Sequence, residues 1–229
     1  MLSQAEQKRI RSLQTKKGRR ETGLCLVEGE KVIQAAASAI VERFDRNDVE
    51  SEAAFLKLVT TESPQEQAAI ARIPEAALDD LMKKEVIVVL DGVQDPGNVG
   101  AILRLCLGFR AGLILIESAD VTSSKVIRSS VGAMFQVPWM VVPRGEAEVV
   151  IASLDRPVYR LEKRDGSEEL ENLKSTGPIV LIAGSEGGGI QLPAPGTSIA
   201  IKHASELESL NVGHALAIVL HHLQRSLKT

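Results

Sequence analysis

The sequence predicts an α/β protein whose C-terminal part contains a parallel sheet. Three continuous apolar runs are typical of strands that are buried on both faces, and they occupy residues 86–90, 113–116 and 178–183. Segments with helical periodicity alternate with these runs, at 99–109, 125–135 and 146–154. This alternation indicates a parallel sheet, and an amphipathic helix is predicted to close the chain over 210–227.

Residues 1–84 precede this pattern and predict a smaller α/β domain. The segment 23–29 reads as a short strand that ends in glycine, and 30–40 has helical spacing. Shorter elements are predicted at 64–71 and 74–82. We therefore expect two domains, residues 1–84 and residues 85–229.

The overall charge does not indicate a nucleic-acid ligand, because the net charge is −3 and the isoelectric point is near 5.9. The first 20 residues nevertheless hold one acid, Glu6, against a basic cluster of Lys8, Arg9, Arg11, Lys16, Lys17, Arg19 and Arg20. This cluster either contacts RNA phosphates or forms a solvated, frayed N-terminus.

Cysteine and histidine positions and hydropathy bear on the cellular compartment, on membrane spans and on metal binding. Cys25 and Cys106 are far apart and form no metal-binding or disulfide pattern, which fits a reduced, cytoplasmic compartment. No apolar run reaches the length of a membrane span, and no export signal precedes the first domain. His214, His221 and His222 share one helix without an acid or thiol to complete a metal shell, so no metal site is predicted.

Three short segments carry the candidate chemistry. In the first, Pro96–Gly97 forms a turn, Asn98 is suited to cap a helix that begins at Val99, and Arg104 follows about one and a half turns later. A capped helix with an incidental arginine would look the same, so the other two segments decide between these readings.

The second segment, 184–189, follows the 178–183 strand and contains four glycines in six positions and one acid, Glu186. Its spacing is not a dinucleotide fingerprint, and a flexible hairpin is the alternative. The third segment follows a strand that ends at Ile201. There, Ser209-Leu210-Asn211 opens the last helix, with Ser209 as a plain N-cap in the simplest reading.

In this order, the three segments resemble the SpoU (TrmH-like) family of SPOUT methyltransferases. The resemblance covers residues 86–229, and it extends more loosely to 1–84, which is similar to a ribosomal-protein-like RNA-binding domain. It implies a C-terminal SPOUT α/β domain with a deep trefoil knot, a homodimer, and S-adenosylmethionine as the methyl donor to a ribose 2′-hydroxyl of RNA.

The resemblance also assigns roles to individual residues. Those implied to be catalytic are Asn98, Arg104, Glu186, Ser209 and Asn211. Those implied to bind the cofactor are Gly184, Ile201 and Leu210. Lys202-His203 departs from the family's usual proline-methionine after Ile201, and Gly213 stands where serine is frequent. These two departures leave the identity of the substrate undetermined. Arg128, Ser129 and the Gly132-Ala133 pair resemble a helix that lies near the substrate in the family, and an ordinary packed helix is the close alternative.

Arg104 needs a chemical role that a guanidinium can fill. A ribose hydroxyl is a poor nucleophile, so an enzyme must align its oxygen and assist loss of its proton. Because a guanidinium keeps its own proton, we expect Arg104 to clamp the adjacent phosphate and stabilise the developing alkoxide. In the homodimer that the resemblance implies, Arg104 of one protomer serves the cofactor pocket of the other. The general base is left open.

The predicted function is therefore an RNA ribose 2′-O-methyltransferase with ribosomal RNA favoured over transfer RNA. The alternatives are a transfer-RNA methyltransferase and a non-catalytic RNA-binding or assembly protein. Neither the RNA nor the nucleotide can be read from the sequence.

Overall fold

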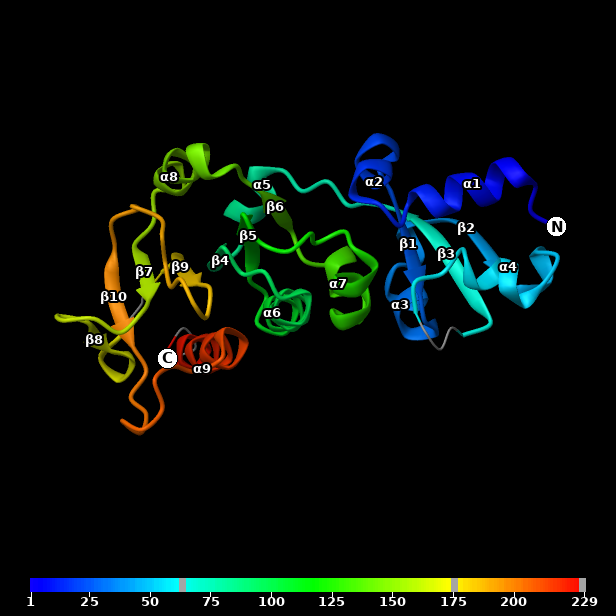
Figure 1. The fold of residues 1–229 in the computed structure, drawn as a ribbon. Helices are drawn as coiled ribbons and strands as arrows, with labels where there is room; N and C mark the ends of the chain where they lie inside the picture. Colours follow the sequence, from blue (N-terminus) through cyan, green and yellow to red (C-terminus); the bar gives the residue numbers. More distant parts are fainter. Residues whose placement is uncertain (62–64, 174–176, 227–229) are drawn as a thin grey trace. The chain divides into compact units, whose positions relative to one another are not determined.

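The computed structural model describes residues 1–61, 65–173 and 177–226. The chain divides into two compact units (Figure 1). The first unit contains Met1–Pro74 and Asp120–Gln136, and the second contains Glu75–Ala119 and the chain from Val137 onward. No helix in these described ranges is both long and apolar enough to cross a membrane.

The first unit is a small α/β unit built on an antiparallel sheet with strand order β1-β3-β2. Its strands are β1 (Leu24–Glu28), β2 (Ile40–Asp45) and β3 (Gln67–Arg72). Its helices are α1 (Gln4–Ser12), α2 (Lys16–Thr22), α3 (Glu30–Ala35), α4 (Glu52–Leu56) and α7 (Ser124–Ser129), with 3-10 turns at Ala37–Ala39, Arg46–Asp48 and Ala133–Phe135. The predicted helix 30–40 is thus shorter, because the chain enters β2 at Ile40. Of the predicted element 64–71, residue 64 lies outside the described residues.

The basic N-terminus is ordered structure, so a frayed tail is the wrong interpretation. Ser3 caps α1 in a capping box with Glu6, and Thr15 caps α2. Ile10 and Leu13 are fully buried in the core of this unit. The first 20 residues therefore stabilise the unit through their apolar side chains, whatever their cations contact.

The segment Asp120–Gln136 belongs to the first unit, although its sequence position lies inside the predicted second domain. The predicted helix 125–135 ends at Ser129, because Val131 and Gly132 take positive φ values of 51° and 79°. A Cβ atom on Gly132 would lie 2.5 Å from the side chain of Ala35, so this close approach requires glycine. Helix α7 packs against β1, where Arg128 contacts the buried Glu28. Arg128 and Ser129 therefore belong to a packed helix of the first unit.

The second unit carries a parallel sheet with strand order β6-β5-β4-β9-β7-β10-β8. The strands are β4 (Val86–Asp91), β5 (Gly112–Ile116), β6 (Trp139–Val141), β7 (Val158–Leu161), β8 (Glu168–Glu169), β9 (Ile179–Gly184) and β10 (Thr197–Ala200). The helices are α5 (Leu78–Met82), α6 (Pro96–Gly108), α8 (Arg144–Ser153) and α9 (Val212–Ser226), with a 3-10 turn at Leu170–Asn172. This confirms the predicted α/β class and the three buried strands.

Helices cover both faces of this sheet (Figure 1). Alternate side chains of β4, Ile87 and Val89, pack with Ala147 and Ile151 of α8 in one core. Helices α6 and α9 lie against each other on the opposite face, where α9 contacts β9. Strand β4 therefore leads into α6, whereas its neighbour β9 leads into the 184–189 segment, and α9 follows β10 in the chain.

Candidate active site

The candidate site lies where β4 and β9 end. The two strands are paired in parallel, with Asp91 opposite Gly184, so both chains leave the sheet at the same edge. Ligand sites in open parallel sheets form at this carboxyl edge. Asn98 follows β4 and Glu186 follows β9, which explains how residues 88 positions apart in sequence can meet.

Helix α6 begins earlier than the sequence indicates, and Asn98 is not its cap. Asp95 is the N-cap, and its side chain accepts a hydrogen bond from the backbone N–H of Asn98 at 3.1 Å. Pro96 occupies the first helical turn, where a missing N–H costs nothing. Asn98 therefore lies inside the first turn, and its side-chain amide is free to take other partners.

Three sequence-predicted residues form one hydrogen-bonded group, the amide–carboxylate cluster of Asn98, Glu186 and Asn211. Asn98 Nδ2 donates to Glu186 Oε1 at 3.1 Å. Asn211 Nδ2 donates to the same oxygen at 2.7 Å and to Asn98 Oδ1 at 3.0 Å. Within the described ranges, Oε2 of Glu186 has no hydrogen-bond partner. The cluster thus holds a carboxylate in a fixed orientation with one oxygen available to a ligand.

Asn211 also begins the last helix. Its Oδ1 accepts from the backbone N–H groups of Gly213 and His214, at 3.0 and 3.2 Å, which is the geometry of an N-cap. Ser209 is exposed and is not the cap. A Cβ atom on Gly213 would lie 3.3 Å from Asn211 Oδ1, so glycine leaves this cap undisturbed. One side chain therefore both starts α9 and holds Glu186.

Gly184 is required by its own loop. An added Cβ atom would lie 2.1 Å from the backbone of Gly189, because the loop folds back in a bridge between Ser185 and Gly189. The sequence argument placed a ligand in this space, whereas the structure fills it with backbone. Contact between Gly184 and the cofactor stays a prediction.

Asp91 supports this loop, and the sequence analysis did not single it out. The carboxylate is buried, and Oδ2 accepts from the backbone N–H groups of Gln191 and Leu192 at 2.5 and 2.7 Å. Its other oxygen accepts from Arg144 Nη2 at 2.8 Å. A lone acid at the end of an apolar run is the signal that could have identified it, since a buried charge requires partners.

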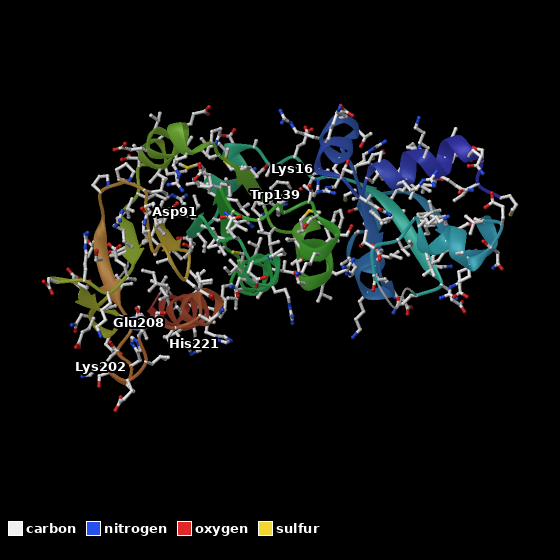
Figure 2. All side chains as sticks on the ribbon, in the orientation of Figure 1. Lys16, Asp91, Trp139, Lys202, Glu208 and His221 are labelled. Carbon is white, nitrogen blue, oxygen red and sulfur yellow. The ribbon has the colours of Figure 1, made fainter. Side chains whose placement is uncertain are left out.

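A cavity of about 140 Å³ lies between the ends of β7 and β10 and the start of α9. Its lining includes three of the predicted residues, Ile201, Ser209 and Leu210. The others are Leu161, Glu162, Lys163, Ile199, Ala200, His203, Glu208 and Ala215. Lys202 and Glu208, on the loop between β10 and α9, are labelled in Figure 2, as is Asp91.

Glu162 is a charged residue of this cavity whose side chain is fixed by hydrogen bonds. Burial acts to raise the pKa of Glu162, but hydrogen bonds from Arg160 and Ser198 outweigh it, so the pKa of this carboxyl lies below its usual range. Arg160 is itself buried and donates to the carbonyls of Leu192 and Ala194. Glu162 therefore stays ionised on the cavity wall.

Arg104 does not join the amide–carboxylate cluster. It lies on α6 six residues beyond Asn98, which turns it to a different side of the helix, and its side chain is exposed. Among the described residues it has no ion pair or hydrogen bond. The structure therefore leaves this guanidinium available to a molecule other than its own chain.

The two cysteines are free and buried, and burial raises the pKa of each thiol to about 12. Both are therefore protonated and unreactive. No group of three metal-binding side chains occurs in the described part of the chain.

The sheet and its candidate site define an α/β protein of the class whose ligand sites form at the carboxyl ends of parallel strands. More particularly, the chain belongs to the SpoU rRNA methylase family, whose sequence profile matches residues 85–221. This confirms the resemblance inferred from the three segments. A second profile, the MRM3-like substrate binding domain, matches residues 5–43.

Individual relatives agree with this assignment. The chain is 31% identical to a 23S rRNA (guanosine(2553)-2′-O)-methyltransferase of Bacillus subtilis, over 93% of this chain and 94% of the relative. A putative TrmH-family RNA methyltransferase structure from Porphyromonas gingivalis superposes with a TM-score of 0.83 at 29% identity, covering 99% of this chain and 100% of that one. An AdoMet-bound rRNA methyltransferase from Sinorhizobium meliloti gives 0.86 at 25% identity, with 99% and 97% covered.

Proposed function

We propose that the protein transfers a methyl group from S-adenosylmethionine to a ribose 2′-hydroxyl of ribosomal RNA. Two of the relatives described above are named as rRNA methyltransferases, one of them specific for 23S rRNA and the other bound to this cofactor. The observation that carries the proposal is the amide–carboxylate cluster at the carboxyl edge of the sheet, in the same unit as a cavity whose lining includes Ile201, Ser209 and Leu210.

The cavity fits part of such a cofactor. Its walls are largely apolar, and they carry one carboxylate whose pKa is held low, Glu162. They also carry a buried nitrogen, His203 Nε2, that has no hydrogen-bond partner among the residues that the structure describes. Ile201, Leu210 and Gly184 are the residues we expect to hold the adenosyl group. When bound, the cofactor supplies a methyl group on a positively charged sulfur that departs as a neutral thioether.

The protein's own residues then position the ribose. Asn98 and Asn211 fix Glu186 through Oε1, and the unpaired Oε2 is placed to accept a hydrogen bond from a substrate hydroxyl. Ser209 lies on the rim and is exposed. Arg104 clamps the phosphate beside this ribose and stabilises negative charge on its oxygen.

The first unit supplies RNA affinity in this proposal. Lys16, Lys17 and Arg20 are exposed on α2, where together with Glu21 they line a hollow. Exposed cations of this kind bind phosphates without reading bases. We extend the proposal to a homodimer, because the exposed Arg104 is then free to serve the pocket of a second copy, and to a cytoplasmic location with the ribosomal RNA. The knot stays a prediction of the family resemblance.

The test combines binding and mapping. Calorimetry should detect binding of S-adenosylmethionine to the protein. In a deletion strain, ribose 2′-O-methylation should disappear at one nucleotide of ribosomal RNA and return when the wild-type gene is restored. A missing mark in transfer RNA would favour the second substrate class. Absence of cofactor binding at millimolar concentration would favour a non-catalytic RNA-binding protein and overturn the proposal.

A further inference from the structure

The loop between β10 and α9 contains a histidine whose two ring nitrogens have different surroundings. His203 Nδ1 lies 2.8 Å from the carbonyl oxygen of Ile201. A carbonyl oxygen only accepts hydrogen bonds, so Nδ1 carries the proton that it donates. In the neutral ring Nε2 is then an acceptor with a free lone pair.

In the described part of the chain, Nε2 has no hydrogen-bond donor for that lone pair. The atom is buried, and none of the described residues donates to it. Buried polar atoms are almost always hydrogen-bonded in folded proteins, so an orphaned acceptor indicates a donor that the chain itself does not supply. His203 is also one of the residues that line the cavity beside Ile201 and Leu210. The missing donor is therefore expected inside this cavity.

The cavity narrows the identity of that donor. Whole ligands of drug size occupy roughly 300–1,000 Å³, so a cavity of about 140 Å³ takes one part of the cofactor. Most of its lining residues are apolar, with Ile199, Ile201, Leu210 and Ala215 among them, and Glu162, Lys163 and Glu208 are its charged members. The apolar part of the lining suits the faces of a flat base, and the lone pair of Nε2 can accept from a neutral N–H group on that base.

We propose that His203 is a cofactor-recognition residue, with Nε2 accepting a hydrogen bond from the 6-amino group of adenine. This inference rests on the proposed function, because it assumes that the adenosyl group enters this cavity. It assigns a specific task to a residue at which this sequence departs from the usual family pattern. The Nδ1 contact to Ile201 fixes the ring so that the acceptor faces the ligand rather than rotating away.

Two substitutions separate the two ring nitrogens. In His203→Asn, the amide nitrogen can still donate to the Ile201 carbonyl, but no atom reaches the position of Nε2. In His203→Gln, the side-chain oxygen can replace Nε2 as acceptor. Lys202→Ala serves as the matched control, because Lys202 is exposed on the same loop and is not among the cavity-lining residues.

The readout is calorimetric affinity for S-adenosylhomocysteine and for its analogue with hydrogen in place of the 6-amino group. We expect His203→Asn to lower the affinity for S-adenosylhomocysteine about tenfold, which is the scale of one lost buried hydrogen bond. His203→Gln should stay within about threefold of wild type, and Lys202→Ala should be unchanged. The analogue should bind wild type and His203→Asn equally.

Three results would overturn the inference. One is wild-type affinity in His203→Asn with a thermal unfolding midpoint that is unchanged. Another is an equal loss for both ligands, which would mean that His203 shapes the loop without contacting the amino group. If wild-type protein binds neither ligand, the proposed function itself fails, and the assignment of His203 fails with it.

Discussion

The two units use polar side chains in different ways. In the second unit, Asn98, Glu186 and Asn211 come from three separate segments and bond to one another. In the first unit, the cations of α2 are divided. Arg19 is buried and paired with Asp120 at 2.5 Å, whereas Lys16 and its exposed neighbours face solvent.

This difference separates positioning from attraction. A reacting group must be held at a fixed place before reaction, and mutual hydrogen bonds achieve this. Phosphate attraction needs charge density more than fixed geometry, so exposed and mobile lysines suffice. Arg104 is the exception within the second unit, because it is exposed like the α2 cations and yet is proposed to act in catalysis.

Arg104→Ala therefore provides the largest expected effect and the sharpest test of this comparison. We expect methyl transfer to fall about 100-fold or more, as is typical when one electrostatic stabiliser is lost. Cofactor affinity should stay within a few-fold, and stability should change by less than about 0.5 kcal/mol, because the side chain is exposed and has no partner in the described chain. Single-turnover rates with calorimetry check this. An unchanged rate would remove Arg104 from the mechanism.

Gly184→Ala tests the rigidity of the positioned region. The new methyl group would lie 2.1 Å from the backbone of Gly189, so the loop that carries Glu186 must open. We expect a stability loss of about 1–3 kcal/mol, the usual cost of overpacking, together with loss of activity. Denaturant unfolding measures it.

Gly187→Ala is the matched control for this substitution. An added Cβ atom at Gly187 has open space around it, and the residue lies in the same loop. Its stability should match wild type. Equal losses in both variants would mean that the loop tolerates no side chain anywhere, and that the contact at Gly184 is not the cause.

Some of these features could be predicted from the sequence. The apolar runs predict β4, β5 and β9 because only strands covered on both faces are apolar throughout. The three segments that follow strands pointed to the region of Asn98, Glu186 and Asn211, since ligand sites form at the carboxyl edge, but they did not predict the hydrogen bonds among these residues. Strand β7 escaped prediction because it is short and carries Arg160, whose burial depends on Glu162 and the carbonyls of Leu192 and Ala194.

Other features depend on partners that a sequence does not display. Asp95 and Asn98 are both good caps, and only the backbone geometry selects Asp95. Helical periodicity at 125–135 predicts a buried face without saying which unit buries it, so the packing of α7 on β1 was missed. Among the N-terminal cations, the sequence cannot show that Arg19 is paired and Lys16 is exposed.

Asn211→Asp would break the cluster and preserve the helix. Aspartate still caps α9 through the acceptor that Gly213 and His214 use. It cannot donate to Glu186 Oε1, however. It also places a carboxylate oxygen where Asn211 Nδ2 now lies, 2.7 Å from Glu186 Oε1, so the two carboxylates repel each other. We expect methyl transfer to fall about tenfold or more with less than about 1 kcal/mol lost in stability.

Asn211→Ser separates repulsion from the simple loss of a donor. Serine also caps helices but adds no charge, so its activity should lie between wild type and Asn211→Asp. The comparison uses methylation rates and thermal unfolding of the three proteins. Full activity in Asn211→Asp would show that the orientation of Glu186 does not matter to the reaction.

The smallest effect is expected from the exposed cations of α2. Deleting residues 1–20 would remove Ile10 and Leu13 from the core of the first unit, so substitution is the cleaner test. If Lys16, Lys17 and Arg20 contact phosphates, the triple alanine variant should weaken RNA binding and flatten the plot of log affinity against log salt. The slope should fall by roughly 0.7–0.9 for each contact removed. Lys57→Ala, an exposed cation outside α2, should leave the slope unchanged. Calorimetric cofactor affinity should be wild type in both variants. Identical slopes in the triple variant and wild type would mean that RNA binds elsewhere and that the exposed charges of α2 are only solvated.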